Sequence, residues 1–371
     1  MGGTLVSDEV LITGATGFVG MEVLARYLER SDRNLVALVR ADDDAGARAR
    51  MQGVLTNLFG NVRGAWYGRR VDAVAAELTA PRLGLSRAQC VALAERVGSI
   101  VHSAASVSFT LPLHEAREIN VEGTRRMLEF ASLAQEHGGL ERFGHLSTAY
   151  VAGTFTGRYG ELDDDVGQDF NNTYEQSKLE AEQLVRSQAA IPSTIMRPSI
   201  VVGDQRSGWT SAFNVLYWPL RAFARGLFEA VPAVPTAPVD VVSVDYVADA
   251  VYALCTSGAD GTYHLTAGDG ASTIEEIAHA ASRYFKRPLP EVVPPAEFAG
   301  RNCAVIEGSR AYFPYFSVGA VFDDARARAR LVPAGVSATP LREYLDRLLD
   351  YATLSRWGKR PLARGEALVG A

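Results

Sequence analysis

A tyrosine and a lysine four residues apart, Tyr174 and Lys178, form the pair in this sequence best suited to chemistry. On a helix, residues at this spacing lie on one face, about one turn apart. A protonated amine there stabilises a phenolate, so we expect the pKa of Tyr174 to fall below its usual value of about 10. Its hydroxyl would then exchange a proton near neutral pH. The chain has 14 tyrosines but three lysines, and no other tyrosine precedes a lysine at this spacing. Taken alone, the pair could also be a surface contact.

A glycine-rich segment near the N-terminus, residues 13–20 with the sequence TGATGFVG, falls between an expected strand and an expected helix. Gly14 permits a tight turn, Gly17 lets the backbone approach a pyrophosphate, and Gly20 permits close packing of helix and sheet. The free N–H groups and positive dipole at the start of such a helix favour phosphate. An ordinary glycine-rich turn is the alternative, but the position between a strand and a helix favours a dinucleotide site.

The end of the second expected strand carries information about the cofactor. Sites that prefer NAD place an acidic residue there to bind the ribose 2′-hydroxyl, whereas this strand ends in Arg40. A guanidinium suits a 2′-phosphate through its charge and its fork of donors. Arg40 could also be a solvated surface residue in an arginine-rich chain, and Asp42 to Asp44 follow closely. We expect NADPH (NADP) to be favoured over NADH.

Further positions could complete a catalytic site. The segment of residues 145–150, HLSTAY, places hydroxyls at the C-terminal end of an expected parallel strand, where ligands of open α/β sheets bind. Asn120 interrupts the apolar side of an expected long helix, either as part of a proton relay or as a buried, satisfied amide. Arg197 and Pro198 end the strand that follows the helix of Tyr174, within reach of the nicotinamide.

Short apolar runs alternate with helical patterns, which predicts an α/β fold with a doubly wound Rossmann-type parallel sheet and a smaller C-terminal substrate-binding lobe. Residues 1–203 would form the NADP-binding Rossmann domain that carries the catalytic residues. Residues 204–371 would form mainly the substrate-binding lobe and C-terminal helices, with some segments returning to the core. In this second part, proline residues punctuate a looped region that could form a lid.

The pattern predicts the following elements along the chain. Strands are expected at residues 10–13, 35–39, 71–78, 100–103, 143–147, 194–202 and 263–265. Helices are expected at residues 18–28, 86–96, 115–137, 174–187, 244–254, 272–285 and 340–354, with helix and loop over 42–70. Ser272 and Thr273, with Glu275 and Glu276, resemble an N-cap with an acidic first turn. The last dozen residues are expected to fray.

The composition bounds the possible partners. A chain of 371 residues with 47 % hydrophobic and 22 % charged residues is ordinary for a globular protein. The net charge of −6 gives no reason to expect nucleic acid or an anionic membrane as a partner. The most apolar later stretch, residues 238–255, is interrupted by three aspartates, so we expect no membrane span.

Cysteine usage and the N-terminus favour a reducing compartment. Cys90, Cys255 and Cys303 are few and far apart, so they predict neither a metal site nor a disulfide framework. Asp8 and Glu9 stand where a signal peptide would be apolar. We expect a cytoplasmic protein, monomeric or homodimeric, without a metal ion.

Together these residues resemble an extended short-chain dehydrogenase/reductase over residues 8–255. The features shared are the TGxxGxxG turn, the Asn120 segment, the Ser147-Thr148 strand end and the Tyr174/Lys178 pair. Within that superfamily the chain is most similar to the fatty acyl-CoA reductase and carrier-protein thioester reductase group. Supporting segments are residues 38–41 (LVRA), 78–86 (LTAPRLGLS), 102–107 (HSAASV) and 145–150 (HLSTAY).

The chain departs from the group at two places. Ala76-Glu77 replaces the Gly-Asp that commonly precedes the leucine after the third strand, which could alter the adenine contact. Ser103 stands where Asn or Cys is often found. No adenylation or carrier domain fits in the sequence, so we expect a stand-alone reductase.

The resemblance implies NADPH-dependent reduction of an acyl thioester, free or tethered to a carrier, to an aldehyde or alcohol. Tyr174 would donate a proton to the carbonyl oxygen, Thr148 would hydrogen-bond that oxygen, and Lys178 would bind the nicotinamide ribose. Asn120 would act as the fourth catalytic residue. Implied cofactor contacts are Thr13, Gly14, Thr16, Gly17, Phe18, Gly20, Arg40, Glu77, Leu78, Ser103, Ala104, Lys178, Arg197 and Pro198.

Three other functions stay open at this stage. A nucleotide-sugar epimerase or dehydratase would use NAD and an acidic end to the second strand. An NADP-dependent oxidoreductase of a steroid-like or polyketide-like ketone or alcohol would use the same catalytic residues. A non-catalytic NADP sensor would not need them. An aromatic group in the second part could line an acyl pocket or form an ordinary core: Trp209, Phe213, Tyr217, Trp218, Phe223 and Phe228.

Overall fold

Seven short apolar strands pair in parallel to form the central sheet of the protein, described here by a computed structural model. The structure describes residues 8–227, 230–294 and 307–369. The order across the sheet is β12-β7-β5-β4-β1-β2-β3. The strands are β1 (Glu9–Thr13), β2 (Leu35–Val39), β3 (Val71–Ala75), β4 (Val97–His102), β5 (Arg142–Leu146), β7 (Ser193–Pro198) and β12 (Gly261–Leu265). The α/β Rossmann-type fold class expected from the sequence is confirmed.

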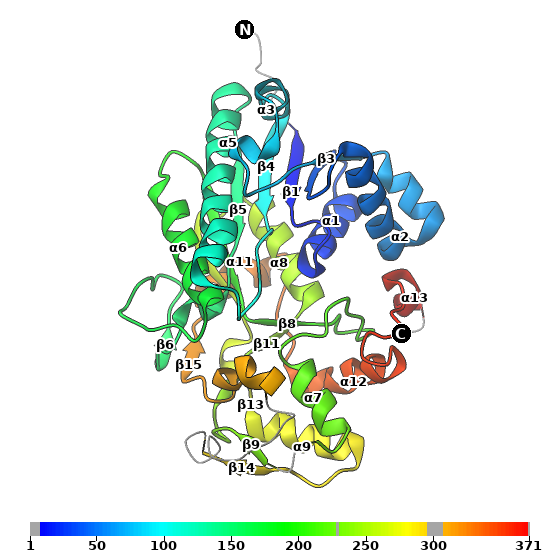
Figure 1. Ribbon diagram of the computed structural model, residues 1–371, viewed down its shortest axis with the longest axis vertical. Coiled ribbons are helices and arrows are strands. Elements are labelled where there is room, and N and C mark those ends of the chain that lie inside the picture. The colour runs from blue at the N-terminus through cyan, green and yellow to red at the C-terminus, as the bar shows by residue number, and fades with distance from the viewer. Residues whose placement is uncertain (1–7, 228–229, 295–306, 370–371) are drawn as a thin grey trace.

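Helices cover both faces of this sheet, because strands buried on both sides need an apolar layer on each (Figure 1). One face packs against α1 (Phe18–Arg30), α2 (Asp44–Gly68), α8 (Val244–Thr256) and α11 (Ala325–Leu331). The other packs against α3 (Arg87–Ala94), α5 (Gly123–His137) and α6 (Thr173–Ser187), with α4 (Leu113–Arg117) beside α6. The carboxyl ends of the strands point toward the smaller lobe.

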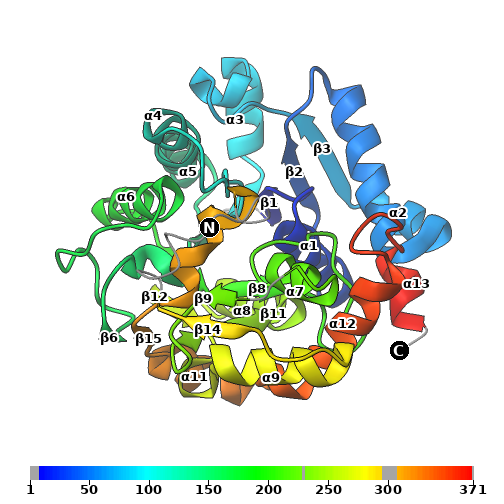
Figure 2. The ribbon, with the colours of Figure 1, turned by 60° about the horizontal axis from the view of Figure 1, so that its bottom comes forward.

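The smaller lobe lies below the sheet edge and has its own apolar core (Figures 1 and 2). Its two-stranded pairs are β8 (Ile200–Val202) with β11 (Val241–Ser243), β9 (Ala230–Pro232) with β14 (Glu291–Val293), β10 (Pro238–Val239) with β13 (Ser272–Thr273), and β6 (Gly157–Tyr159) with β15 (Ala320–Phe322). Its helical elements include α7 (Tyr217–Ala224), α9 (Ile274–Phe285), the 3₁₀ segment η5 (Glu307–Phe316) and α12 (Leu345–Leu354). The domain boundary at residue 203 stays a prediction.

Two expected elements are interrupted in the structure. The long helix expected over 115–137 contains a π-helical turn, Glu118–Glu122, between α4 and α5; such turns are frequent at functional sites. The strand expected over 194–202 divides after Pro198, which pairs with Leu265. The chain then leaves the main sheet, and β8 pairs with β11 instead. The third strand ends at Ala75, three residues earlier than expected.

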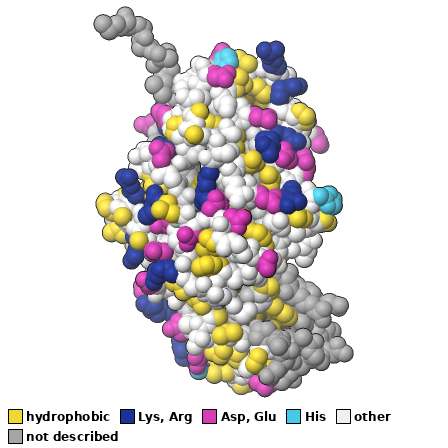
Figure 3. Space-filling view, turned by 90° about the vertical axis from the view of Figure 1, so that its left-hand side faces the viewer, with side chains coloured by type: hydrophobic (Ala, Val, Ile, Leu, Met, Phe, Trp, Pro, Cys, Tyr) yellow, Lys and Arg dark blue, Asp and Glu magenta, His cyan; other side chains and the backbone are white. Residues whose placement is uncertain are grey.

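The expected N-terminus of the helix at residues 272–285 is confirmed. Thr273 caps α9 in a capping box with Glu276. Cys90 and Cys255 are free and buried, while Cys303 lies outside the described residues. On the face shown in Figure 3, acidic and basic side chains are interspersed.

Among the described residues, none of the helices combines the length and apolar composition needed to cross a bilayer. Within the same ranges, no group of three or more His, Cys, Asp or Glu side chains is placed to hold a metal ion.

The expectation that the last dozen residues fray is wrong for α13 (Arg364–Val369), which packs against α2. The Arg364 Nε lies 2.6 Å from the Glu22 Oε1 in α1, and the Trp209 indole N–H donates to the carbonyl of Leu362. Burial raises the pKa of Glu22, and its two arginine neighbours oppose that shift. A buried carboxylate needs such partners, so the tail is fixed by Glu22.

We predict that Arg364→Ala lowers the free energy of unfolding by about 2–3 kcal/mol, because Glu22 keeps only Arg26 as a partner. Urea denaturation followed by tryptophan fluorescence measures this. Arg360→Ala is the matched control, since Arg360 is exposed and should change stability by less than about 0.5 kcal/mol. Equal stability of the two variants would show that the pairing of Arg364 with Glu22 contributes nothing to stability.

Candidate active site

The glycine turn between β1 and α1 is sterically fixed at two positions. Gly14 has a φ of +73°, and a Cβ there would come within 2.7 Å of the Ala104 nitrogen. A Cβ on Gly20 would come within 2.1 Å of the Gly14 carbonyl oxygen. Neither position accepts a side chain without moving backbone. Helix α1 starts after Gly17 with no side-chain cap, so its first N–H groups are free to bind an anion. The turn therefore fits a dinucleotide pyrophosphate.

Buried hydrogen bonds hold the neighbouring strand ends to this turn. The Thr13 hydroxyl lies 2.8 Å from His102 Nδ1 and accepts from the Ala104 N–H at 3.2 Å. The other ring nitrogen of His102 lies 3.1 Å from the Thr124 hydroxyl in α5. Burial lowers the pKa of His102 to about 3, so the ring is neutral. Thr13 is thus a structural contact beside the turn.

The residues expected around the adenosine lie at the ends of β2 and β3. Arg40 is exposed directly after β2. The nearby Asp43 caps α2 by accepting the Gly46 N–H at 2.7 Å, and Asp44 accepts the Ala75 N–H at 2.8 Å. Two of the three aspartates that follow Arg40 therefore have structural roles. Thr16, Phe18, Leu78 and Ser103 lie partly buried in the same region.

Glu77, which stands in place of the usual aspartate, is turned toward its own loop. Its Oε1 accepts from the N–H and the hydroxyl of Thr79 at 3.0 and 2.9 Å. The carbonyl of Leu78 accepts from Arg126. The altered residue therefore stabilises the turn after β3, and its role toward the adenine stays a prediction.

The hydroxyls of Thr148 and Tyr174 meet at the carboxyl end of the sheet. Thr148 follows β5 and caps a 3₁₀ turn, accepting from the Tyr150 N–H at 3.2 Å. Tyr174 lies in the first turn of α6. Its hydroxyl is near enough to Thr148 for that side chain to act on the tyrosine pKa. Both residues therefore lie at the same end of the sheet, and their catalytic roles stay predictions.

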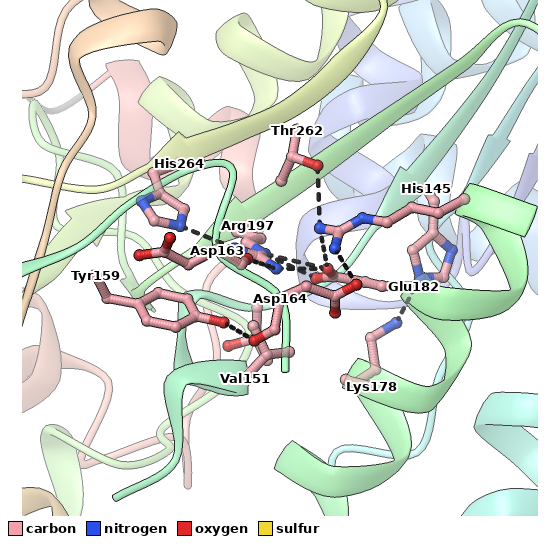
Figure 4. A network of polar contacts seen from close by, with 12 residues as sticks. His145, Val151, Tyr159, Asp163, Asp164, Lys178, Glu182, Arg197, Thr262 and His264 are labelled. Atoms are coloured by element: carbon pink, nitrogen blue, oxygen red, sulfur yellow. Dashed lines mark hydrogen bonds and ion pairs between the residues drawn. The ribbon is translucent and has the colours of Figure 1, made fainter. Parts of the chain in front are cut away.

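Lys178 lies one turn further along α6 and is 2 % exposed. Its Nζ donates to the carbonyl of Leu146 at 2.8 Å and lies 3.4 Å from His145 Nε2 (Figure 4). Burial lowers the pKa of Lys178 to about 8. Burial, with Lys178 and His102 beside it, keeps the pKa of His145 well below its usual value. The His145 imidazole is therefore neutral, and the Lys178 amine carries the positive charge of this site.

The expected lowering of the Tyr174 pKa is wrong for this structure. Burial raises that pKa to about 12, the hydrogen bond with Thr148 opposes the shift, and the Glu175 carboxylate adds to it. The amine of Lys178 is held at the end of β5 instead of at the phenol. Residues four apart share a helix face, but burial has a larger effect on this phenol than the neighbouring charge.

Asn120 is a fully satisfied buried amide. Its Oδ1 accepts from the Ser106 N–H at 2.8 Å, and its Nδ2 donates to the Ser106 carbonyl and the Ser177 hydroxyl. Its own carbonyl accepts from Thr124. The side chain sits in the π-helical turn and ties the loop after β4 to α6. These contacts match the structural interpretation of Asn120, and its part in a proton relay stays a prediction.

Arg197 does not offer its side chain to a cofactor, which corrects the sequence expectation. The guanidinium is fully buried and bonded to the Glu182 carboxylate, with a shortest distance of 2.7 Å (Figure 4). It also donates to the carbonyl of Asp163 and lies 3.3 Å from His264 Nε2. Pro198 contributes a carbonyl that accepts from the Thr148 hydroxyl at 3.4 Å. Sequence reasoning could not show on which side of the strand Arg197 points.

An apolar pocket with a cavity volume of about 90 Å³ lies in the smaller lobe. Its wall includes Ile200, Leu220, Phe223, Ile277 and Tyr315. The aromatic group singled out in the sequence therefore divides: Phe223 lines the pocket, whereas Trp209 packs against Phe18 and Phe213 stacks on Tyr351. The Tyr217 hydroxyl accepts from the Gly203 N–H, and Trp218 lies against Tyr312. Phe228 lies outside the described residues.

Comparison with known proteins identifies the family of this chain. Residues 12–251 match the NAD-binding family described as Male sterility protein. An isonitrile lipopeptide synthase from Streptomyces coeruleorubidus is 34 % identical over 233 residues, 58 % of this chain and 14 % of that protein. Fatty acyl-CoA reductase 1 from Gallus gallus is 28 % identical over 332 residues, 76 % of this chain and 62 % of that protein. This chain thus spans less than two thirds of either relative.

A solved structure supports the fold. The terminal R domain from the myxalamid PKS-NRPS biosynthetic pathway superposes with a TM-score of 0.80 at 24 % identity, covering 96 % of this chain and 93 % of that one. The resemblance to the fatty acyl-CoA reductase and thioester reductase group is confirmed by these matches. A nicotinamide dinucleotide as the cofactor agrees with the family.

We predict that Glu182→Gln lowers the free energy of unfolding by about 3–5 kcal/mol, because the Arg197 charge stays buried without a carboxylate. The folded variant should bind NADPH as tightly as the wild type, measured by quenching of nicotinamide fluorescence. Glu180→Gln is the control: its carboxylate pairs with Arg117 near the surface, so about 0.5 kcal/mol is expected. If Glu182→Gln instead bound NADPH more weakly and kept its stability, Arg197 would be a cofactor contact after all.

Proposed function

We propose that this chain, which belongs to the family described as Male sterility protein, reduces an acyl thioester to an aldehyde or alcohol with NADPH. The observation that carries the proposal is that Thr148, after β5, and Tyr174, in the first turn of α6, lie together at the end of the sheet that holds the glycine turn. Two hydroxyls at one point can both contact a single carbonyl oxygen. The adjoining apolar pocket offers room for the acyl chain.

Tyr174 carries its proton at neutral pH and can act as a proton donor. A phenol with a pKa of about 12 keeps its proton at neutral pH, and reduction of a carbonyl needs a proton at the oxygen as negative charge develops there. Thr148 is 4 % exposed, so its hydroxyl is shielded from bulk water and can hydrogen-bond the same oxygen. Tyr174 is therefore in the protonated form that reduction of a carbonyl requires.

The described residues fit a dinucleotide. The turn at Gly14 and the uncapped start of α1 would hold the pyrophosphate, and Lys178 would bind the nicotinamide ribose. When bound, the reduced nicotinamide supplies a hydride to the carbonyl carbon. Tyr174 Oη then donates its proton to the carbonyl oxygen while Thr148 stabilises it. Collapse of the resulting thiohemiacetal breaks the carbon–sulfur bond and releases an aldehyde and a thiol.

NADPH is proposed over NADH because of Arg40. Its guanidinium is exposed at the end of β2, where the ribose hydroxyls of the adenosine bind in this fold. Asp43 and Asp44 are occupied by backbone N–H groups. A 2′-phosphate would meet a cation with two parallel donors. A nucleotide-sugar epimerase would need an acid there and a polar sugar site, whereas the pocket beside Tyr315 is apolar.

The identity of the acyl carrier belongs to the same proposal. Coenzyme A and the phosphopantetheine arm of a carrier protein present the same thioester, and either could deliver an acyl group to the pocket. A cytoplasmic location and a monomeric or homodimeric state are likewise proposals. NADPH oxidation against a panel of acyl thioesters, aldehydes and ketones, with NADH as a control, tests the substrate class directly.

We predict that Tyr174→Phe lowers turnover by about 10²–10⁴-fold, because the carbonyl oxygen loses its proton donor. NADPH binding should stay within about twofold of the wild type, since the phenol hydroxyl is not a phosphate contact. Tyr252→Phe, far along α8, is the control and should retain full turnover. Near-normal turnover of Tyr174→Phe would remove the proton-donor role.

We predict that Arg40→Ala raises the dissociation constant of NADPH about tenfold or more and leaves that of NADH unchanged. The difference arises because only NADPH carries the phosphate that the guanidinium would pair with. Fluorescence titration of both cofactors measures it. Arg87→Ala, an exposed arginine at the start of α3, is the control. An equal effect of Arg40→Ala on both cofactors would contradict the assignment of Arg40.

A further inference from the structure

Tyr315 joins the apolar pocket to the catalytic helix. It lies in η5, far along the chain from Tyr174, and is 4 % exposed. One side of its ring forms part of the pocket wall together with Ile200 and Phe223. Its hydroxyl points away from the pocket to the first turn of α6. The same side chain therefore contacts both the proposed acyl site and the helix that carries the proton donor.

The hydroxyl of Tyr315 is part of a closed hydrogen-bond network at the start of α6. It donates to Glu175 Oε1 at 2.7 Å and accepts from Asn172 Nδ2 at 3.0 Å. Asn172 in turn caps the helix by accepting the Glu175 N–H. Glu175 is fully buried, and its other oxygen accepts from the backbone and side chain of Asn171.

No basic side chain pairs with this carboxylate among the ion pairs of the described residues, so its charge depends on these neutral donors. Burial raises the pKa of Glu175, and the hydrogen bond from Tyr315 is the largest of the effects that oppose the rise. The residue next to Tyr174 is thus held in place by a side chain from the other lobe.

The ring of Tyr315 reaches the site by a second route. It stacks on Phe109 with 5.3 Å between ring centres, and Phe109 lies 5.9 Å from the ring of Tyr174. Its edge meets Tyr150, two residues after Thr148, at 4.9 Å. Tyr315 thereby contacts segments next to both hydroxyls of the proposed site.

We infer that Tyr315 is a positioning residue that couples filling of the apolar pocket to the placement of Tyr174. The inference rests on the proposed function, because it needs an acyl chain as the occupant. An acyl chain in the pocket packs against the Tyr315 ring and holds its hydroxyl on Glu175, which fixes the first turn of α6. An acyl group too short to reach the ring leaves that turn less ordered, so it is reduced more slowly even at saturation.

The kinetic test compares Tyr315→Phe with the wild type on acyl-CoA substrates of two to sixteen carbons, with NADPH oxidation as the signal. The wild type should show kcat rising with chain length. In Tyr315→Phe, kcat for long chains should fall about tenfold toward the short-chain value, because a hydrogen bond to a buried charge is lost. KM for long chains should stay within about twofold, since the ring still lines the pocket.

Tyr312→Phe is the matched control. Tyr312 is in the same segment and also contacts Phe109, but its hydroxyl has no hydrogen bond among those of the described residues. It should keep both the wild-type kcat and its dependence on chain length. A Tyr315→Phe enzyme that keeps the wild-type length dependence, or a Tyr312→Phe enzyme that loses it equally, overturns the inference.

A binding measurement separates this inference from the proposed function. A dodecyl thioether of coenzyme A cannot be reduced, so its binding in the presence of NADP is independent of turnover. It should slow amide hydrogen exchange in the first turn of α6 in the wild type and not in Tyr315→Phe. If the wild type reduces no acyl thioester, the proposed function fails, but the exchange measurement still tests the coupling. Equal protection of the first turn of α6 in both proteins refutes the coupling. Protection that is lost only in Tyr315→Phe supports it.

Discussion

Helix α6 buries three charged side chains, and the need to satisfy them determines where the candidate active site lies. Glu175, Lys178 and Glu182 are each 2 % exposed or less. Their spacing of three and then four residues places them in one stripe along the helix. A buried charge is costly unless it finds close partners. The helix can therefore pack against the sheet only in the register that gives each charge its partner.

Each of the three charges binds a different part of the molecule. Glu175 is held by Tyr315 of the smaller lobe, Lys178 by the carbonyl at the end of β5, and Glu182 by Arg197 of β7. Apolar contacts alone would tolerate sliding of the helix along the sheet, because dispersion and area burial have little direction. Three directional contacts, spaced along the helix, prevent such sliding. Because Tyr174 is on the same helix, these contacts also fix its position relative to Thr148.

The sequence predicted the elements well where a local pattern decides the outcome. The glycine turn, the seven parallel strands and the Thr273 cap follow from spacing and from residue type. The stripe on α6 could not be found that way, because charged residues at helical spacing are normally the solvated face. Arg197 illustrates the same limit: a strand pattern does not show which side chain faces a buried carboxylate fifteen residues earlier. Tertiary partners, and not local pattern, decide these positions. The same holds for the C-terminal tail, whose order depends on Glu22 in α1.

The pKa of Tyr174 shows how such tertiary context changes the chemistry inferred from a motif. The spacing of Tyr174 and Lys178 indicates a phenol with a lowered pKa. In the structure, however, the Lys178 amine donates to the Leu146 carbonyl. Burial raises the pKa of Tyr174 to about 12. The ionised form of Glu175, held by Tyr315, adds to that rise. A phenol that retains its proton must be an acid in the first proton transfer. The network that orients α6 therefore also keeps Tyr174 in its protonated form, which is the form that can donate a proton to a carbonyl oxygen.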